Sequence, residues 1–239
     1  MVVCAIVQIR LGSTRLPKKV LLKISGKHVF ALVLDRIKKI KSIDKIIVAT
    51  TTETEDNELV EEIKKYDKFM AIYRGSKNDV LDRYYHAAKE NNADVVVRLT
   101  GDNTLYDPDV SELIINKFLE NNLDYCSNSI IRTFPVGLDT EVFSFNSLEK
   151  AWKNAKTQYE REHVTPYLKN SKIFNIMNVT NPIDLSNLRF TLDYPQDLEF
   201  IKKVYEAFYP RTIFLLSEIL VLLKKKPALK EINKNCIQL

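Results

Sequence analysis

The sequence contains little glycine and little cysteine. Among its 239 residues only five are glycine and three are cysteine. Cys4, Cys126 and Cys236 lie far apart, are odd in number and lack the spacing of a metal site, so we expect the reduced thiols of a cytoplasmic protein and no disulfide framework. No sequence pattern pairs a histidine with a thiol, which argues against a catalytic cysteine.

Long apolar runs are also missing. No run reaches the length that spans a bilayer, and no secretory signal is readable at the N-terminus, so we expect no membrane partner. The net charge of +5 comes from lysines spread over the chain and nearly matched by acidic residues. Because no nucleic-acid-binding motif accompanies this charge, we expect a solvated surface and no nucleic-acid partner.

Two common phosphate-binding motifs are absent. The chain has no G-x-x-x-x-G-K-[ST], which excludes the phosphate loop of the common NTPases. It also lacks the three-glycine fingerprint of dinucleotide-binding proteins, because the loop after its first apolar run contains a single glycine. Any phosphate site in this chain must therefore be built differently.

Apolar runs alternate with amphipathic segments, which indicates an α/β fold. The short β-branched runs typical of buried parallel strands are 2–7, 45–50, 69–73 and 94–100. The segments with helical spacing are 28–40, 55–66 and 79–91. This alternation predicts a doubly wound, mostly parallel sheet with right-handed crossovers. The length suits one domain over 1–239.

The rhythm changes in the second half of the chain. A helix at 109–121 and a strand near 124–127 continue the core, and 128–180 is expected to be a small inserted α+β element that covers the substrate and forms a dimer contact. Within it we predict a strand at 137–145, helical structure over 146–170 with a break near Pro166, and a strand at 173–179. The core then returns with a strand at 188–193 and helices at 195–207 and 211–224.

Positive charge is concentrated in the loop after the first predicted strand. The stretch "QIRLGSTRLPKKV" (8–20) carries Arg10, Arg15, Lys18 and Lys19 around one Gly-Ser-Thr. A loop that only turns a corner needs glycine, proline, asparagine or aspartate rather than fixed positive charge. The loop is therefore either a solvated basic connection or a cradle for an anion.

Two aspartates favour the anion cradle. With a strand order of 3-2-1-4, the loops after the first and fourth strands are neighbours at the switch point where ligands bind. The fourth strand is followed by Gly101 and Asp102, and another predicted strand ends at Asp193. Cations beside carboxylates suit a nucleoside triphosphate with Mg²⁺. The alternatives are a turn residue for Asp102 and a helix N-cap for Asp193.

The loop taken whole resembles the cytidylyltransferases that make CMP-activated acidic sugars. Their first strand is followed by R-x-G-S-T-R-L-P-G-K, and the branch most similar to this chain is linked to spore-coat polysaccharide biosynthesis. Further matching stretches, in order, are "IIVATT" (46–51), "RGSKNDVLDRYYHAA" (74–88), "VVVRLTGDNTLYDP" (95–108), "GLDTEVFS" (137–144), "REHVTPY" (161–167), "LRFTLDYPQDLEF" (188–200) and "LKEIN" (229–233).

The resemblance implies a Rossmann-like nucleotidyltransferase fold and a set of site residues. Those implied to contact the nucleotide are Arg10, Gly12, Ser13, Thr14, Arg15, Lys19, Ala49, Thr50, Arg74, Asp79, Arg83 and Asp102. Those implied to face the sugar are Asp139, Glu141, Glu162 and His163. Arg15, Lys19, Asp102 and Asp193 are the implied catalytic residues, with Asp102 and Asp193 holding Mg²⁺.

One departure from the family pattern leaves a question. Where the family has Pro-Gly-Lys, this chain has Pro17-Lys18-Lys19, so a glycine is replaced by a second lysine. Lys19 matches the pattern, but the sequence leaves open which lysine reaches the phosphates.

The implied reaction is transfer of CMP from CTP to an acidic sugar or related small-molecule acceptor, with release of pyrophosphate, in a cytoplasmic homodimer that makes a surface polysaccharide or glycan. Two other classes stay open: a sugar-nucleotide-dependent glycosyltransferase and a non-catalytic nucleotide-binding protein. The first usually needs an Asp-x-Asp motif after a strand, and here the only such pair, Asp107 and Asp109, straddles a proline. His163 is either a proton shuttle or a structural residue.

Overall fold

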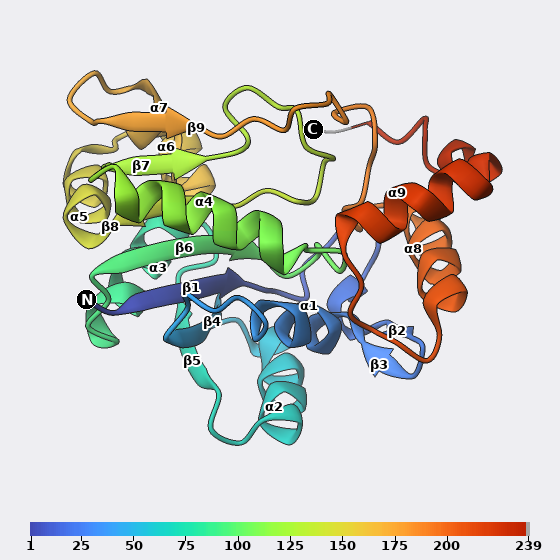
Figure 1. Ribbon diagram of the computed structural model, residues 1–239. Helices are drawn as coiled ribbons and strands as arrows, with labels where there is room; N and C mark the ends of the chain where they lie inside the picture. The colour runs from blue at the N-terminus through green and yellow to red at the C-terminus, as the bar shows by residue number, and fades with distance from the viewer. Residues whose placement is uncertain (238–239) are drawn as a thin grey trace.

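A seven-stranded sheet organises the protein (Figure 1). The computed structural model describes residues 1–237. The strand order is β5-β4-β1-β6-β8-β7-β9. The bounds are β1 Val3–Gln8, β4 Lys45–Thr51, β5 Ala71–Gly75, β6 Val95–Thr100, β7 Tyr125–Ser127, β8 Glu141–Ser144 and β9 Ile176–Asn178. Strands β5, β4, β1 and β6 are parallel, which confirms the predicted 3-2-1-4 order.

Helices cover both faces of this sheet (Figure 1). Their bounds are α1 Val29–Ile37, α2 Asn57–Tyr66, α3 Val80–Glu90, α4 Pro108–Glu120, α5 Phe145–Asn154, α6 Gln158–His163, α7 Pro166–Asn170, α8 Pro195–Phe208 and α9 Leu216–Lys225. Three short 3-10 helices (Lys19–Leu21, Thr54–Asp56 and Pro227–Glu231) and a hairpin of β2 Lys23–Ile24 and β3 Lys27–His28 complete the fold.

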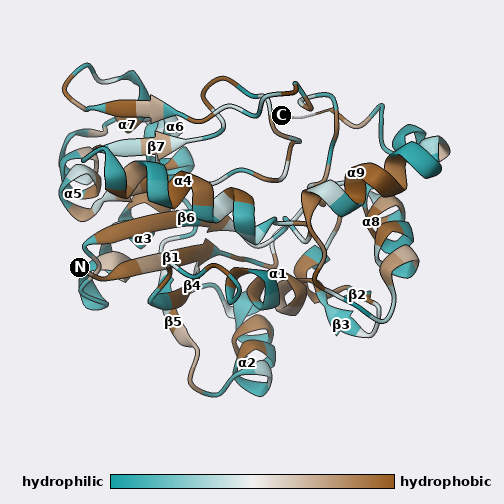
Figure 2. Ribbon diagram, viewed as in Figure 1, coloured by the Kyte–Doolittle hydropathy of each residue, from teal (hydrophilic) through white to brown (hydrophobic). Residues whose placement is uncertain are grey.

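The alternation of side chains along β1 creates the two layers of the core. Val3, Ala5 and Val7 join the cluster that contains the buried faces of α1, α2 and α4. Cys4 and Ile6 point the other way, into the cluster formed with α3 and α5. Both faces of the strand are therefore buried, and Figure 2 shows β1 and β6 as the hydrophobic centre of the sheet. This burial explains why the sequence of β1 is continuously apolar rather than alternating.

The segment 128–180 contributes two strands, β8 and β9, to the seven-stranded sheet. Strand β8 pairs antiparallel with β6 on one side and with β7 on the other. The predicted strand at 137–145 is confined to β8, because Gly137 has a φ of +100° and the chain turns there. The predicted helical stretch is three helices, and the break at Pro166 is confirmed as the start of α7.

The prediction of a core strand at 188–193 is wrong. Its only ladder contact within the described residues is a single bridge between Val136 and Arg189. Leu188, Phe190 and Leu192 instead join a third apolar cluster with α8 and α9. The chain is extended because these alternate residues are buried, but they are buried against helices and not within a sheet.

Two smaller features also bear on the predictions. The last predicted helix begins at Leu216 rather than at 211. The three cysteines are free, with Cys4 and Cys126 buried, and burial raises the pKa of the Cys126 thiol to about 11. No helix within residues 1–237 is both long enough and apolar enough to cross a membrane.

The loop after β1 is anchored by Asp56, at the end of the Thr54–Asp56 turn. Its Oδ1 accepts a hydrogen bond of 2.8 Å from the backbone N–H of Leu11. Its Oδ2 accepts from the hydroxyls of Thr50 and Thr51 at the end of β4. The fully buried carboxylate therefore fixes the start of the basic loop to the neighbouring strand.

We predict that Gly137→Ala destabilises the fold by about 3 kcal/mol. An added Cβ would lie 2.5 Å from the backbone nitrogen of Thr191, and the φ of +100° disfavours any side chain. Urea unfolding measures the change. A loss below about 0.5 kcal/mol would contradict the tight approach of this turn to residues 190–191.

Candidate active site

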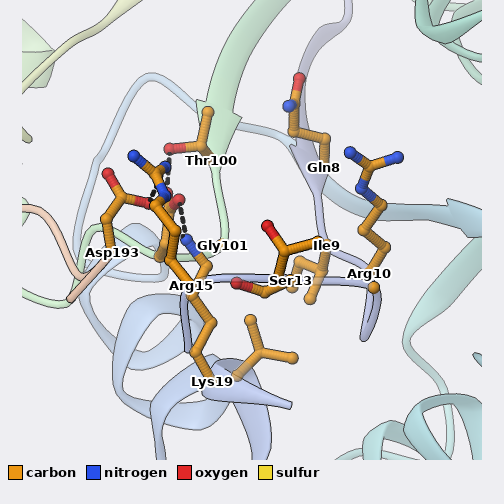
Figure 3. A pocket seen from close by; sticks show the side chains of 13 residues that line it. Gln8, Ile9, Arg10, Ser13, Arg15, Lys19, Thr100, Gly101 and Asp193 are labelled. Atoms are coloured by element: carbon orange, nitrogen blue, oxygen red, sulfur yellow. Dashed lines mark hydrogen bonds and ion pairs between the residues drawn. The ribbon is translucent and has the colours of Figure 1, made fainter. Parts of the chain in front are cut away.

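A polar pocket of about 280 Å³ lies at the carboxyl ends of β1 and β6 (Figure 3). This is the position at which open α/β sheets bind ligands. Three chain segments line it: the loop after β1, the end of β6 and the segment before α8. The lining residues are Gln8, Ile9, Arg10, Gly12, Ser13, Thr14, Arg15, Lys19, Val20, Thr100, Gly101, Asp102 and Asp193.

Lys19 joins the three segments. Its Nζ donates to Asp102 Oδ2 at 2.7 Å, to Asp193 Oδ1 at 2.8 Å and to the backbone oxygen of Leu192 at 2.8 Å. Lys19 is largely buried, with 12% of its side chain exposed. The sequence expectation that the loop and both aspartates meet is therefore confirmed.

The charges of this cluster support one another. Burial opposes the ammonium charge of Lys19, but the attraction of Asp102 and Asp193 outweighs burial and raises the Lys19 pKa. Burial likewise opposes the carboxylate of Asp102, yet Lys19 and the Thr100 hydroxyl hold its pKa below the ordinary value. The shifts of Lys19 and Asp102 therefore both favour the charged forms that pair with each other.

Lys18 does not reach the pocket. Its Nζ pairs with Glu58 at the surface, where both side chains are more than half exposed. Its backbone has a φ of 52° and a ψ of 29°, in the left-handed region that favours glycine. Lys18 thus adopts the left-handed backbone conformation for which the family pattern has a glycine. Lys19 is the lysine that faces the carboxylates.

Asp193 is held by two arginines. Arg15 Nη2 lies 3.1 Å from its Oδ1, and Arg189 Nη2 donates to its Oδ2 at 3.1 Å. The Tyr194 ring contacts both arginines, since the Arg15 guanidinium lies 4.8 Å and the Arg189 guanidinium 5.7 Å from its centre, and its hydroxyl accepts from Arg15 Nη1. Asp193 is not the N-cap of α8, since that position is Tyr194. The N-cap interpretation of Asp193 is therefore wrong.

The donor set fits a divalent metal with nucleotide phosphates. Among residues 1–237 no group of three histidine, cysteine or acidic side chains could hold an ion. Asp102 and Asp193, however, already share one cation, the Lys19 ammonium. Mg²⁺ takes one or two carboxylates and completes its shell with water and phosphate oxygens. The pair is thus of the right type and number, provided that the ammonium moves away.

Five residues assigned to the nucleotide by the sequence lie outside the lining of this pocket, and one of them, Arg83, lines an adjoining pocket. Ala49 and Thr50 are buried in β4. Arg74 donates to the backbone oxygens of Thr51 and Glu53 and to the Asn57 side chain. Asp79 caps α3 and accepts two hydrogen bonds from Arg161. Each makes a contact within the fold, so a nucleotide role for them stays a prediction.

A second pocket of about 190 Å³ adjoins the first. Gln8, Ile9 and Arg10 line both. The remaining lining residues are Val80, Arg83, Arg98, Glu162 and His163. Glu162 and His163, which the sequence assigned to the sugar, thus lie next to the loop that carries Arg15 and Lys19.

Glu141 and Asp139 make different contacts from those expected. The Glu141 carboxylate is buried and accepts from Arg98, Lys169 (2.8 Å), Tyr125 (2.6 Å) and Thr165 (2.7 Å). Asp139 pairs with Arg132. Glu141 has little capacity left for a ligand and is placed to hold Arg98 and Lys169 in position.

Sequence reasoning missed several residues of the site. No chemical motif distinguishes these residues from ordinary polar side chains; they are Asp56, Arg98, Arg189, Tyr194 and Asp197. Asp197 is fully buried and accepts from Arg189 and from the backbone nitrogens of Asp193 and Tyr194. The available signal was the resemblance, since Arg98 lies in the matched stretch "VVVRLTGDNTLYDP" and Arg189, Tyr194 and Asp197 lie in "LRFTLDYPQDLEF".

Comparisons with known proteins agree with this geometry. A family model described as cytidylyltransferase matches residues 4–221. The chain is 40% identical to the uncharacterized protein MJ1063 of Methanocaldococcus jannaschii, over 100% of this chain and 97% of that protein. It is 30% identical to the spore coat polysaccharide biosynthesis protein SpsF of Bacillus subtilis, over 93% of this chain and 94% of that protein.

A solved structure has nearly the same fold over the whole chain. The structure of a cytidylyltransferase from Leptospira borgpetersenii superimposes with a TM-score of 0.91 and 34% identity, covering 100% of this chain and 99% of that one. Together with the family match, this similarity shows that the chain is an enzyme of the cytidylyltransferase family.

Proposed function

We propose that this protein transfers CMP from CTP to an oxygen of an acidic sugar or related acceptor, with Mg²⁺, in the synthesis of a surface polysaccharide or glycan. Membership of the cytidylyltransferase family supports the use of CTP. The observation that carries the rest is the Lys19 ammonium between Asp102 and Asp193, beside the cationic loop. A cytoplasmic location and a homodimer formed through 128–180 remain part of the proposal.

The proposed step is a displacement at the α-phosphorus. An acceptor oxygen forms a new bond to the α-phosphorus, the bond from that phosphorus to the bridging oxygen breaks, and pyrophosphate leaves with its electron pair. The acceptor hydroxyl loses its proton, and His163 in the adjoining pocket is the candidate that takes it. The protein contributes mainly position and charge, as in other phosphoryl-group transfers.

Lys19 has two roles in this proposal. Without nucleotide its ammonium neutralises Asp102 and Asp193, which would otherwise repel each other. With nucleotide, Asp102 and Asp193 would hold the metal, which would supply positive charge to the phosphates, and the Lys19 ammonium would turn to the phosphate oxygens. Arg15 already lies at the same site and adds a second fixed cation.

The function is tested by pyrophosphate release. The purified protein is assayed with CTP, UTP, ATP or GTP, with Mg²⁺ and with eight- and nine-carbon keto-acid sugars. We expect release with CTP that depends on an acidic acceptor. A glycosyltransferase would consume a sugar nucleotide instead, and a binding protein would release nothing; either result would contradict the proposal.

We predict that Asp102→Asn lowers metal-dependent pyrophosphate release by at least about 100-fold, because the amide removes a charged oxygen ligand. Circular dichroism should show an unchanged fold, since asparagine has the same shape. Binding of Mn²⁺ in the presence of CTP, followed by electron paramagnetic resonance, should weaken in parallel. Near-wild-type turnover by the folded variant would exclude Asp102 as a metal ligand.

We predict that Lys19→Met lowers the turnover number by about 100-fold or more, since one fixed donor to the reacting phosphates is lost. Lys18→Gly is the matched control at the next position. It removes an exposed ion pair and relieves a left-handed backbone, so activity should stay within about 3-fold of wild type. Equal losses in the two variants would contradict the assignment of Lys19.

A further inference from the structure

Arg83 is a buried guanidinium without a counter-ion. Only 2% of the residue is exposed. Its Nη1 donates to the backbone oxygen of Ser76 at 3.0 Å, whereas its Nε is buried and has no hydrogen-bond partner within the part of the chain that the structure describes. Among the same residues no carboxylate forms an ion pair with Arg83, and Asp56 is the carboxylate whose charge acts on it from beyond that distance.

The other buried arginines of this protein are better satisfied. Arg36 is fully buried and donates to the backbone oxygens of Tyr106 and Phe214 and to the Tyr205 hydroxyl, with the Phe214 ring 4.3 Å away. Arg98 pairs with the buried carboxylate of Glu141. Arg83 has one backbone acceptor and no carboxylate partner, so it is less well compensated than Arg36 and Arg98, although each of these also has one buried nitrogen without a partner among the described residues.

Arg83 lines the pocket of about 190 Å³ that adjoins the polar pocket of about 280 Å³. Arg10 lines the same pocket, is exposed and forms no ion pair with any residue in 1–237. In Figure 3 the Arg10 side chain points away from the Lys19–Asp193 cluster, next to Gln8. Glu162 is the one acidic side chain in the lining, and it has no ion pair among the described residues.

This arrangement is costly without a ligand. A buried charge that is not paired loses its hydration and gains little in return. Burial lowers the pKa of Arg83 and the like charge of Arg10 lowers it further, whereas Tyr84 and the Asp56 carboxylate oppose this shift. Proteins keep such groups mainly at functional sites, where a ligand of opposite charge completes the pairing.

We propose that Arg83 and Arg10 form an anion subsite that binds a carboxylate, or another negative group, of the acceptor. The inference rests on the proposed function. The base and ribose of CTP are uncharged, and its triphosphate has Lys19 and Arg15 in the neighbouring pocket. The subsite shares Gln8, Ile9 and Arg10 with that pocket, so the acceptor's negative group lies close to its reacting oxygen. In this proposal Arg83 recognises the acceptor, in place of the nucleotide contact that the resemblance implied for it.

The first test compares arginine variants by thermal unfolding without ligands. Arg83→Met removes an unpaired buried charge and keeps the aliphatic packing, so the melting temperature should be unchanged or higher. Arg98→Met removes one of the four donors to the buried Glu141 carboxylate. Arg36→Met leaves two backbone oxygens without a donor, so both variants should have a lower melting temperature. If Arg83→Met is destabilised as much as the other two, Arg83 is a structural residue and the proposal is overturned.

The second test separates the substrates. For Arg83→Met we expect an affinity for CTP with Mg²⁺ within about 3-fold of wild type, and a KM for a keto-acid sugar raised at least about 30-fold, as for a lost charge-assisted bond. Glu162→Gln should lower that KM, because a competing negative charge is gone. For a carboxamide analogue of the acid, the KM of wild type and the KM of Arg83→Met should be nearly equal.

The outcomes distinguish this inference from the proposed function. Weaker CTP binding in Arg83→Met, or turnover that the substitution leaves unchanged, would overturn the subsite while CTP transfer stands. If wild type turns over no acid, the proposed function fails, and crystals soaked in bromide then decide the subsite. An anomalous peak beside Arg10 and Arg83 would support it, and its absence there would overturn it.

Discussion

The shared ion cluster of Lys19, Asp102 and Asp193 is the interaction on which the site depends. It joins a loop after β1, a turn after β6 and the segment before α8, which are far apart in the sequence. Parallel pairing of β1 with β6 brings Lys19 and Asp102 to one edge of the sheet. Asp193 arrives separately, through the packing of Leu188, Phe190 and Leu192 on α8 and α9. Two cores must therefore form before the site is complete.

The ion cluster also explains why several other charged residues lie around Asp193. Asp193 accepts from Arg15 and Arg189, and the buried Asp197 fixes Arg189 and the backbone of Asp193. Partly buried ion pairs contribute little net stability, because desolvation offsets attraction. Their value here is geometric, because they hold the carboxylates of Asp102 and Asp193 close together around the single ammonium of Lys19.

The sequence was informative where function follows from topology. The parallel strands and the carboxyl-end position of the basic loop beside Asp102 follow from alternating apolar runs and strand-end residues, given the strand order that the structure confirms. Asp193 was correctly expected at the same place, but it arrives through helix packing and not at the end of a strand. The failures came where tertiary contacts decide. Residues 188–193 have the pattern of a strand but are buried by helices. Arg74, Asp79 and Glu141 have partners within the fold that no motif reveals, and their expected ligand roles stay predictions. The left-handed backbone of Lys18 cannot be recognised from the lysine itself. Only the glycine that the family pattern has at this position indicates it.

The central claim is that the Lys19 ammonium gives way to a metal when nucleotide binds. A crystal structure with CTP and Mn²⁺, with the metal located by anomalous scattering, tests it most directly. The account predicts a metal peak between Asp102 and Asp193 and the Lys19 Nζ on a phosphate oxygen. A complex in which Lys19 still bridges the two aspartates, with the metal elsewhere, would contradict it.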